Sequence, residues 1–432
     1  MTYQQAVDYI HSRPRFKNTD NHRAMRKLLS LMGNPQDNLK FVHIAGTNGK
    51  GSCAAMSANI LKTAGYRVGM NISPFVIEFT ERFQINGEYI PKDTLAGITE
   101  KIKYWQEQIL QEDGLELLEF EIVTAIAFYW FNMEKVDVVC LEVGIGGLLD
   151  STNVIKDCLV ACIMNISYDH TSVLGNTLAE IAYQKAGIIK LGRPVVTYPA
   201  QDESALAAIR SVAEEKAAEL TVPDKNSIKT ANTGFMRSRL EYGGLTVNQA
   251  FTGIHQSYNA SVVIDAMKIL RQQGFAITDE DIVRGIETTR FPARIEVLSE
   301  KPLVILDGGH NMDGVTALRK VLAENNITGL TAVWASLSDK EPEKIIELMK
   351  PYIDILYTVP LHGARAIEPQ KLAEMASPYF NEVIPSDSVQ QALDMAMENC
   401  PGGLLVFGSL YLAADAREHI ISVLEKVTAA DR

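Results

Sequence analysis

The sequence has few cysteines, a shortage of positive charge and no long apolar run. Its five cysteines are sparse and odd in number, which argues against a secreted disulfide framework, and none has the CxxC spacing of a zinc site. The longest unbroken apolar stretches, 125–131 and 158–164, are far shorter than the roughly 20 residues that a membrane-spanning helix needs. Residues 1–16 do not resemble a secretory signal. These absences predict a cytoplasmic protein with no membrane partner.

The shortage of positive charge limits the partners further. The 432 residues include 41 Lys and Arg against 53 Asp and Glu, a net charge of −12. A general nucleic-acid binder needs a basic face, so we expect no nucleic-acid partner. An anionic ligand would have to be received by a few local cations. Hydrophobic residues make up 47% of the chain, enough for more than one core.

The apolar pattern alternates between strands and helices, which predicts an α/β fold with parallel sheets covered by helices. A helix is predicted to begin at Asp20 and to end near Gly33. Buried strands are predicted at 41–45, 136–143 and 158–166, with a helix over 52–64. Polar residues become more frequent over 221–252, which indicates antiparallel strands.

A change of pattern near Pro292 predicts a domain boundary, because proline disfavours helical backbone at the residue before it. We expect a nucleotide-binding domain over 1–292, a hinge over 293–298 and a smaller α/β domain over 299–432. The strands of the second domain are predicted at 303–306, 331–334, 353–358 and 404–407.

A glycine-rich loop at 46–52 follows the first predicted strand. Its glycines allow successive N–H groups to surround a phosphate at a helix N-terminus, while Lys50 adds positive charge and the Ser52 hydroxyl can ligate Mg²⁺. The loop departs from GxxxxGK[ST], because Ile44 replaces the first glycine and an extra glycine separates Lys50 from Ser52. An ordinary turn is the alternative, and the dinucleotide fingerprint fits poorly at 144–149, which lacks the last glycine. The context favours a nucleoside triphosphate.

Two further polar groups follow buried strands. Glu142 ends one strand, and the carboxyl ends of parallel strands are where ligands collect, so Glu142 is a candidate Mg²⁺ ligand. Asp169 and His170 follow the next strand and could bind metal or phosphate. The structural alternatives are a solvated glutamate and a histidine that only supports the fold.

Lys185 occupies an unusual place, because it falls on the apolar stripe of a predicted helix together with Leu178, Ile181 and Ile188. A lysine there must be paired, have a lowered pKa or be chemically modified. The alternative is that its ammonium group reaches back to the surface.

A series of motifs runs along nearly the whole chain in a specific order. They are TNGKGS at 47–52, SP at 73–74, ERFQING at 81–87, EFE at 119–121, EVGIGG at 142–147, DSTN at 150–153, DH at 169–170, KAGIIK at 185–190, HQSYN at 255–259, PARIE at 292–296, DGGHN at 307–311 and GSLYL at 408–412. This series resembles the folylpolyglutamate synthase and dihydrofolate synthase family of the Mur ligase superfamily. The resemblance implies a P-loop ATPase domain with a mainly parallel sheet, which also binds folate, and a smaller Rossmann-like α/β domain that binds glutamate.

The resemblance implies an ATP-dependent ligase that adds L-glutamate to the carboxylate of a reduced folate, or of dihydropteroate, through an acyl phosphate. It further implies a monomer with two Mg²⁺ sites, a monovalent cation and a CO₂-derived carbamate on Lys185. Two alternatives remain. A Mur-type ligase for a UDP-linked peptidoglycan precursor is disfavoured, because only 40 residues precede the first predicted strand. A non-catalytic nucleotide-binding paralogue would need neither a second metal nor an amine site.

The resemblance also implies roles for individual residues. Catalytic roles fall on Lys50, Lys185, Asp307 and His310. The implied ATP-binding residues are Thr47, Asn48, Gly49, Lys50, Gly51, Ser52, Asn259, Arg294 and Asp307. The implied metal ligands are Ser52, Ser73, Glu142, His170 and Lys185. The implied folate-binding residues are Arg82, Glu119, Phe120, Glu121, Leu149, Asp150 and Ser151, and the implied glutamate-binding residues are His310, Ser409 and Tyr411.

Overall fold

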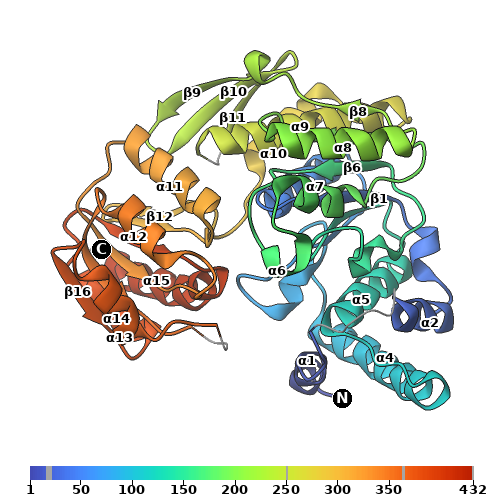
Figure 1. The fold of residues 1–432 in the computed structure, drawn as a ribbon, viewed down its shortest axis with the longest axis horizontal. Helices are drawn as coiled ribbons and strands as arrows, with labels where there is room; N and C mark the ends of the chain where they lie inside the picture. Colours follow the sequence, from blue (N-terminus) through green and yellow to red (C-terminus); the bar gives the residue numbers. More distant parts are fainter. Residues whose placement is uncertain (16–21, 250–251, 362–364, 431–432) are drawn as a thin grey trace.

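The computed structural model describes residues 1–15, 22–249, 252–361 and 365–430, and it has the predicted α/β architecture (Figure 1). The helix start predicted at Asp20 lies outside the described residues. Three sheets follow one another along the chain, with eight, three and six strands. No helix in the described ranges is long and apolar enough to cross a membrane.

The eight-stranded sheet forms the centre of the N-terminal part, in the order β4-β3-β2-β5-β1-β6-β7-β8. Strands β2 and β5 to β8 pair in parallel with β1 and with one another, whereas β3 and β4 are antiparallel additions at one edge. The strands are β1 (Phe41–Ala45), β2 (Val68–Asn71), β3 (Phe83–Ile85), β4 (Glu88–Tyr89), β5 (Val138–Glu142), β6 (Val160–Ile163), β7 (Val195–Thr197) and β8 (Leu220–Thr221).

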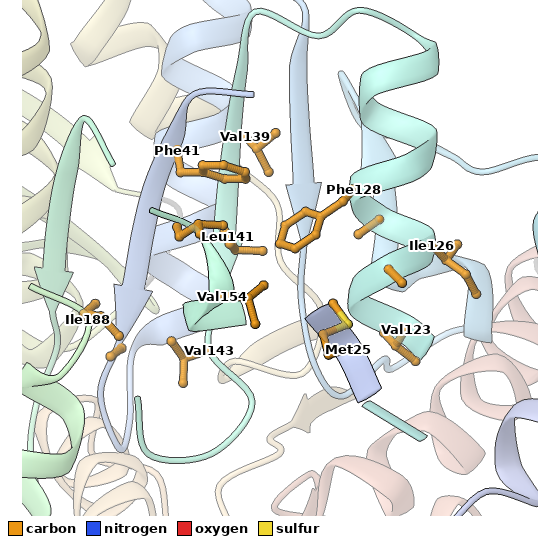
Figure 2. Close-up of a cluster of buried hydrophobic side chains, with 14 of the residues drawn as sticks. Met25, Phe41, Val123, Ile126, Phe128, Val139, Leu141, Val143, Val154 and Ile188 are labelled. Carbon is orange, nitrogen blue, oxygen red and sulfur yellow. The ribbon is translucent and has the colours of Figure 1, made fainter. Parts of the chain in front are cut away.

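Helices cover both faces of this sheet, so β1 is buried on both sides. They are α1 (Tyr3–His11), α2 (Arg23–Leu31), α3 (Lys50–Thr63), α4 (Lys92–Asp113), α5 (Glu119–Met133), α6 (Thr171–Leu174), α7 (Leu178–Ala186), α8 (Glu203–Glu215), α9 (Ile254–Gln272) and α10 (Asp279–Thr288). Phe41 packs into the cluster between the sheet and α5, where its ring centroid lies 5.6 Å from that of Phe128 (Figure 2). Val42 and Ile44 point the other way, toward α3 and α9.

The strands predicted at 41–45, 136–143 and 158–166 are β1, β5 and β6, and the last two are shorter than predicted at both ends. The antiparallel strands predicted within 221–252 are also confirmed. They are β9 (Lys229–Gly234), β10 (Arg237–Tyr242) and β11 (Leu245–Gln249), which lie along one side of α9 and α10 (Figure 1).

The six-stranded sheet forms the C-terminal part, in the order β12-β13-β17-β14-β15-β16, with only β12 antiparallel. Its strands are β12 (Glu296–Glu300), β13 (Leu303–Leu306), β14 (Leu330–Trp334), β15 (Ile353–Thr358), β16 (Glu382–Pro385) and β17 (Leu404–Phe407). Its helices are α11 (Met312–Glu324), α12 (Pro342–Met349), α13 (Pro369–Ala376), α14 (Val389–Glu398) and α15 (Leu410–Ala430). Residues 296–298 of the predicted hinge belong to β12, and the predicted domain bounds stay a prediction.

The packing of α3 on α10 supports the loop that precedes α3, and it can be tested with two glycines. A Cβ atom at Gly285 of α10 would lie 2.6 Å from Cα of Ile60 in α3, whereas Gly97 in α4 has open space around it. We expect Gly285→Ala to lower the free energy of unfolding by about 1–3 kcal/mol through overpacking. Gly97→Ala, the control, should raise it by up to about 1 kcal/mol, since alanine favours the helix. Denaturant titration would measure both, and equal effects would contradict this account of the α3–α10 contact.

Candidate active site

The loop between β1 and α3 wraps around the Lys50 side chain. Nζ of Lys50 donates hydrogen bonds to the carbonyl oxygens of Gly46 (3.1 Å) and Thr47 (3.0 Å). Gly49 precedes the helix with φ of +86°, a conformation that glycine adopts without strain. A Cβ atom at Gly49 would lie 2.5 Å from Oδ1 of Asn259, so glycine is required for α9 to approach the loop. The N–H groups at the start of α3 are thereby placed to receive an anion.

The charge of Lys50 is not neutralised by direct contact, since both of its hydrogen-bond acceptors are neutral carbonyl groups. Burial lowers the pKa of Lys50, and the carboxylates of Glu142 and Asp169 oppose this shift. Ser52 is buried in the first turn of α3. Gly51 allows the ring of Phe291 to pack against the same turn, because a Cβ atom at this position would lie 2.6 Å from that ring. A buried cation at a helix N-terminus is suited to phosphate oxygens.

Glu142, at the end of β5, lies beside the segment that follows β2. It is 5% exposed, and its Oε2 accepts a hydrogen bond from the Ser73 N–H at 3.2 Å. The Ser73 hydroxyl in turn accepts one from Nη1 of Arg82 at 3.0 Å. The Arg82 guanidinium lies 5.3 Å from the ring centroids of Phe75 and Phe79. Burial raises the pKa of Glu142, and the nearby cations oppose that shift.

Lys185 is buried on α7, as the apolar stripe predicted, and its Nζ donates to the carbonyl oxygen of Gly46 at 2.9 Å. Burial, helped by the charge of Lys50, lowers the pKa of Lys185 to about 7. His170 follows β6 with φ of +49°. Burial lowers the pKa of His170 to about 4, although Asp169 opposes the shift. A neutral amine can react with CO₂, and a neutral imidazole can ligate a metal ion.

The predicted metal ligands do not form a conventional cluster. Within the ranges that the structure describes, no group of three or more His, Cys, Asp or Glu side chains could hold a metal ion. The predicted set instead combines the carboxylate of Glu142 with the hydroxyls of Ser52 and Ser73, together with His170 and Lys185. Carboxylate and hydroxyl oxygens suit Mg²⁺, so the set fits this ion provided that Lys185 becomes an anionic ligand.

The C-terminal part contributes a cation and a carboxylate to the same charged region. Burial lowers the pKa of Arg294. The carboxylates of Asp307, in the C-terminal part, and Glu142, in the N-terminal part, oppose this shift, so Arg294 interacts electrostatically with both parts of the chain. Oδ1 of Asp307 accepts a hydrogen bond from the Ile295 N–H, and Oδ2 accepts one from the Gly309 N–H, each at 3.0 Å. These bonds hold the Asp307 carboxylate still at the end of β13.

Comparison with known proteins shows the family to which the chain belongs. The Mur ligase middle domain matches residues 44–267, and the glutamate ligase domain of Mur ligases matches residues 293–410. The chain is 33% identical to the folylpolyglutamate synthase of Lacticaseibacillus casei, over 98% of this chain and 99% of that protein. It is 34% identical to the dihydrofolate synthase/folylpolyglutamate synthase of Bacillus subtilis, over 97% and 99%. The chain belongs to the folylpolyglutamate synthase/dihydrofolate synthase family of Mur ligases.

A solved member of this family, an FPGS complex with AMPPCP and folate, superposes with a TM-score of 0.81 at 30% identity, covering 98% of this chain and 100% of that one. The fold expected from the resemblance, a P-loop ATPase domain followed by a smaller α/β domain, is therefore confirmed.

The family resemblance predicted folate-binding roles, which stay predictions, and the structure shows where these residues lie. Oε1 of Glu119 lies 3.0 Å from His11, its Oε2 accepts from Arg15, and Oε2 of Glu121 accepts from the Leu118 N–H. Both carboxylates are therefore already engaged within the protein. Of the others, the Phe120 ring packs against Gly144, Leu149 is exposed, Ser151 is buried, and buried Asp150 accepts from the N–H groups of Ile145 and Thr152.

The residues predicted to bind glutamate lie at the ends of C-terminal strands. His310 Nε2 lies 3.8 Å from Oδ2 of Asp169, across the boundary between the two parts of the chain. Ser409, after β17, accepts a hydrogen bond through its Oγ from the Tyr411 N–H at 3.1 Å. The Tyr411 side chain is exposed. His310 and Tyr411 thus both lie near the N-terminal part, since Tyr411 interacts electrostatically with Arg82.

Sequence reasoning missed three charged residues beside the candidate site. Buried Glu81 accepts hydrogen bonds from the N–H groups of Val76 (2.9 Å) and Ile77 (2.6 Å), which shapes the segment after Ser73. Lys340 forms a buried ion pair with Asp169, and Asp313 accepts a hydrogen bond from Asn48 of the glycine-rich loop at 2.8 Å. The positions of Lys340 and Asp313 depend on contacts between distant segments, so no local pattern could have indicated them.

The buried amine of Lys185 predicts a pH dependence of stability. Between the pKa of about 7 in the folded protein and the ordinary 10.5, the unfolded chain binds a proton at Lys185 that the folded protein does not. The free energy of unfolding should therefore rise with pH in this window. We expect the wild type to gain roughly 2 kcal/mol relative to Lys185→Met between pH 7 and 9, measured by denaturant titration in CO₂-free buffer. Parallel pH profiles for the two proteins would contradict this burial.

Proposed function

We propose that the protein is an ATP-dependent ligase that joins L-glutamate to the carboxylate of a folate, with dihydropteroate as a second acceptor. The observation that carries the proposal is the charged region between the two parts of the chain. Lys50 of the glycine-rich loop interacts there with Glu142, Lys185 and Arg294, and Arg294 also interacts with Glu142. Two relatives that align with nearly the whole chain, a folylpolyglutamate synthase and a dihydrofolate synthase/folylpolyglutamate synthase, support it further.

The first half of the reaction must activate a carboxylate, because an oxide ion is too poor a leaving group for direct amide formation. Transfer of the γ-phosphoryl group of ATP gives an acyl phosphate, whose leaving group is phosphate. The protein's part in such a transfer is positioning and charge stabilisation. The N–H groups at the start of α3 and the ammonium of Lys50 would hold the β- and γ-phosphates. In this assignment Asn259 and Arg294 approach the nucleotide from α9 and the C-terminal part.

Mg²⁺ would be held by Ser52, Ser73, Glu142, His170 and a carbamate on Lys185. When bound, it would neutralise charge on the phosphate oxygens. The carbamate would form when the neutral Lys185 amine adds to CO₂ and releases a proton, which changes a buried cation into an anion. This conversion would also relieve the repulsion between Lys185 and Lys50, which lowers the Lys185 pKa in the unmodified protein.

In the second half of the reaction, the neutral amine of glutamate attacks the acyl phosphate and phosphate leaves. The amine must lose a proton, and both Asp307 and His310 follow β13 at the boundary between the two parts. Burial raises the pKa of Asp307, which makes its carboxylate a better proton acceptor than an exposed one. Ser409 and Tyr411 would hold the incoming glutamate. We infer that ATP and folate together draw the two parts closer.

The pterin acid would lie between the segments that carry Arg82, Phe120 and Asp150. A relative solved with AMPPCP and folate supports this choice of ligand class. Arg82 offers a cation near the expected carboxylate, and its guanidinium is already stacked on two phenylalanine rings. Glu119 and Glu121 act in this assignment mainly by shaping the start of α5.

An enzymatic assay tests the proposal directly. ADP release should require L-glutamate together with tetrahydrofolate or dihydropteroate, and each pterin product should gain the mass of one glutamyl residue. A UDP-muramoyl acceptor should give no ADP above background. ADP release with that acceptor would favour a peptidoglycan ligase, and no release with any acceptor would favour a non-catalytic nucleotide-binding protein.

The phosphate-binding role of Lys50 predicts a large kinetic defect. Lys50→Ala should lower kcat/KM for ATP by at least about 100-fold, the scale expected when a charge-stabilising group is removed. Lys62→Ala is the matched control, because Lys62 lies in the last turn of the same helix and is exposed. Steady-state kinetics would measure both variants. Near-normal ligation by Lys50→Ala would remove this lysine from the ATP site.

A further inference from the structure

Two acidic residues that no step above uses lie on opposite sides of the boundary between the N-terminal and C-terminal parts. Asp169 follows β6 in the N-terminal part, and Asp313 lies in the first turn of α11 in the C-terminal part. Each carboxylate accepts hydrogen bonds from side chains of the other part. This reciprocal arrangement lies directly beside the glycine-rich loop.

Asp313 is bound by two side-chain amides of the N-terminal part. Its Oδ2 accepts hydrogen bonds from Nδ2 of Asn48 (2.8 Å) and Nδ2 of Asn165 (2.5 Å). Asn48 is also paired with Asn311, since each amide donates to the other at 3.3 and 3.2 Å. The Asn48 side chain, which belongs to the loop, is therefore oriented largely by α11.

Asp169 is bound by the C-terminal part in the same manner. Its Oδ1 accepts from Nζ of Lys340, and both side chains are 8% exposed. Its Oδ2 accepts from Nδ2 of Asn311 at 3.4 Å. The buried ion pair and the amide bond hold the start of α11 against the N-terminal part. This contact keeps Asp313 within reach of Asn48.

The loop itself offers Asn48 only weaker restraint. Within the N-terminal part, the acceptor near Nδ2 of Asn48 is the Ser167 hydroxyl, at 3.4 Å. The carboxylate of Asp313 is both closer and charged, and hydrogen bonds to charged groups are the stronger ones. The amide of Asn48 thus joins this carboxylate to the backbone of the loop. Thr47 is held within the N-terminal part by hydrogen bonds with Asn165 and Ser167. The orientation of the Asn48 side chain therefore depends on a residue 265 positions away in the sequence.

We propose that Asp313 is a positioning residue for the phosphate loop: it orients Asn48 from the C-terminal part, so that the loop is complete for ATP only when the two parts are docked. The inference rests on the proposed function, because it requires that the loop binds a nucleotide. It assigns no contact between Asp313 and ATP. The Asp169–Lys340 pair holds the two parts together, and Asp313 then orients the Asn48 side chain of the loop.

Equilibrium binding of AMPPCP with Mg²⁺, measured by calorimetry, tests this role without catalysis. Asp313→Ala should weaken binding about tenfold, the usual scale for loss of a charged hydrogen bond. Asp313→Asn should recover most of the affinity, since its amide oxygen can still accept from Asn48. The double variant Asn48→Ala/Asp313→Ala should bind no more weakly than Asn48→Ala, because the two residues act through one contact.

Matched controls separate positioning from a general loss of structure. Glu343→Ala removes an exposed acid from the first turn of α12 and should bind AMPPCP as the wild type does. The thermal midpoint of ligand-free Asp313→Ala should stay close to that of the wild type. Lys340→Met should weaken AMPPCP binding, whereas Lys344→Met, at an exposed lysine four positions on, should not.

The outcomes distinguish this inference from the proposed function. Wild-type affinity in Asp313→Ala, or independent losses in the double variant, would overturn the positioning role and leave the proposed function standing. Tighter binding by Asp313→Ala would also overturn it, because the carboxylate would then repel the triphosphate. Absence of AMPPCP binding by the wild-type protein would overturn the proposed function and the inference together.

Discussion

The candidate site depends on positive charge that the fold buries without a contacting counter-ion. Nζ of Lys50 donates to carbonyl oxygens of its own loop, and Nζ of Lys185 donates to the Gly46 carbonyl. Two lysine side chains therefore converge on one loop, where burial disfavours the charged form of each and lowers both pKa values. Such an arrangement is stabilised when an anion arrives, or when one of the amines is converted to an anion. In a chain with a net charge of −12, this region is where an anionic substrate can be received.

The sheet explains why these groups meet. β1 lies between β5 and β6 in parallel, so the loop after β1, Glu142 at the end of β5 and His170 beyond β6 share one edge. Both faces of β1 are buried, with Phe41 packed toward α5 and Val42 toward α3. The packing holds the strand ends rigidly, and the glycines of the loop allow α9 to approach. A site on such a frame has little freedom to rearrange.

That boundary is polar rather than apolar near the loop. The contacts between Asn48, Asn311 and Asp313, and the pair formed by Asp169 and Lys340, are hydrogen bonds and charges. Polar contacts of this kind exchange with water more readily than a hydrophobic interface does, so they suit the movement of the two parts that the proposed function includes. In that proposal, the C-terminal part supplies Asp307 and His310 in the docked arrangement.

Local pattern determined much of this protein from its sequence. The apolar strands at 41–45 and 303–306 match β1 and β13 without change, and the stripe through Lys185 predicted its burial, since periodicity reports which face is covered. The half-exposed edge strands β12 and β16 lacked a comparable apolar signal and were not predicted. Only the tertiary structure decided that Glu119 is engaged by His11 and Arg15, that Lys340 pairs with Asp169 and that Asp313 reaches the loop. These are contacts between segments far apart in the chain, which depend on how helices and sheets pack, and no spacing along the sequence encodes them.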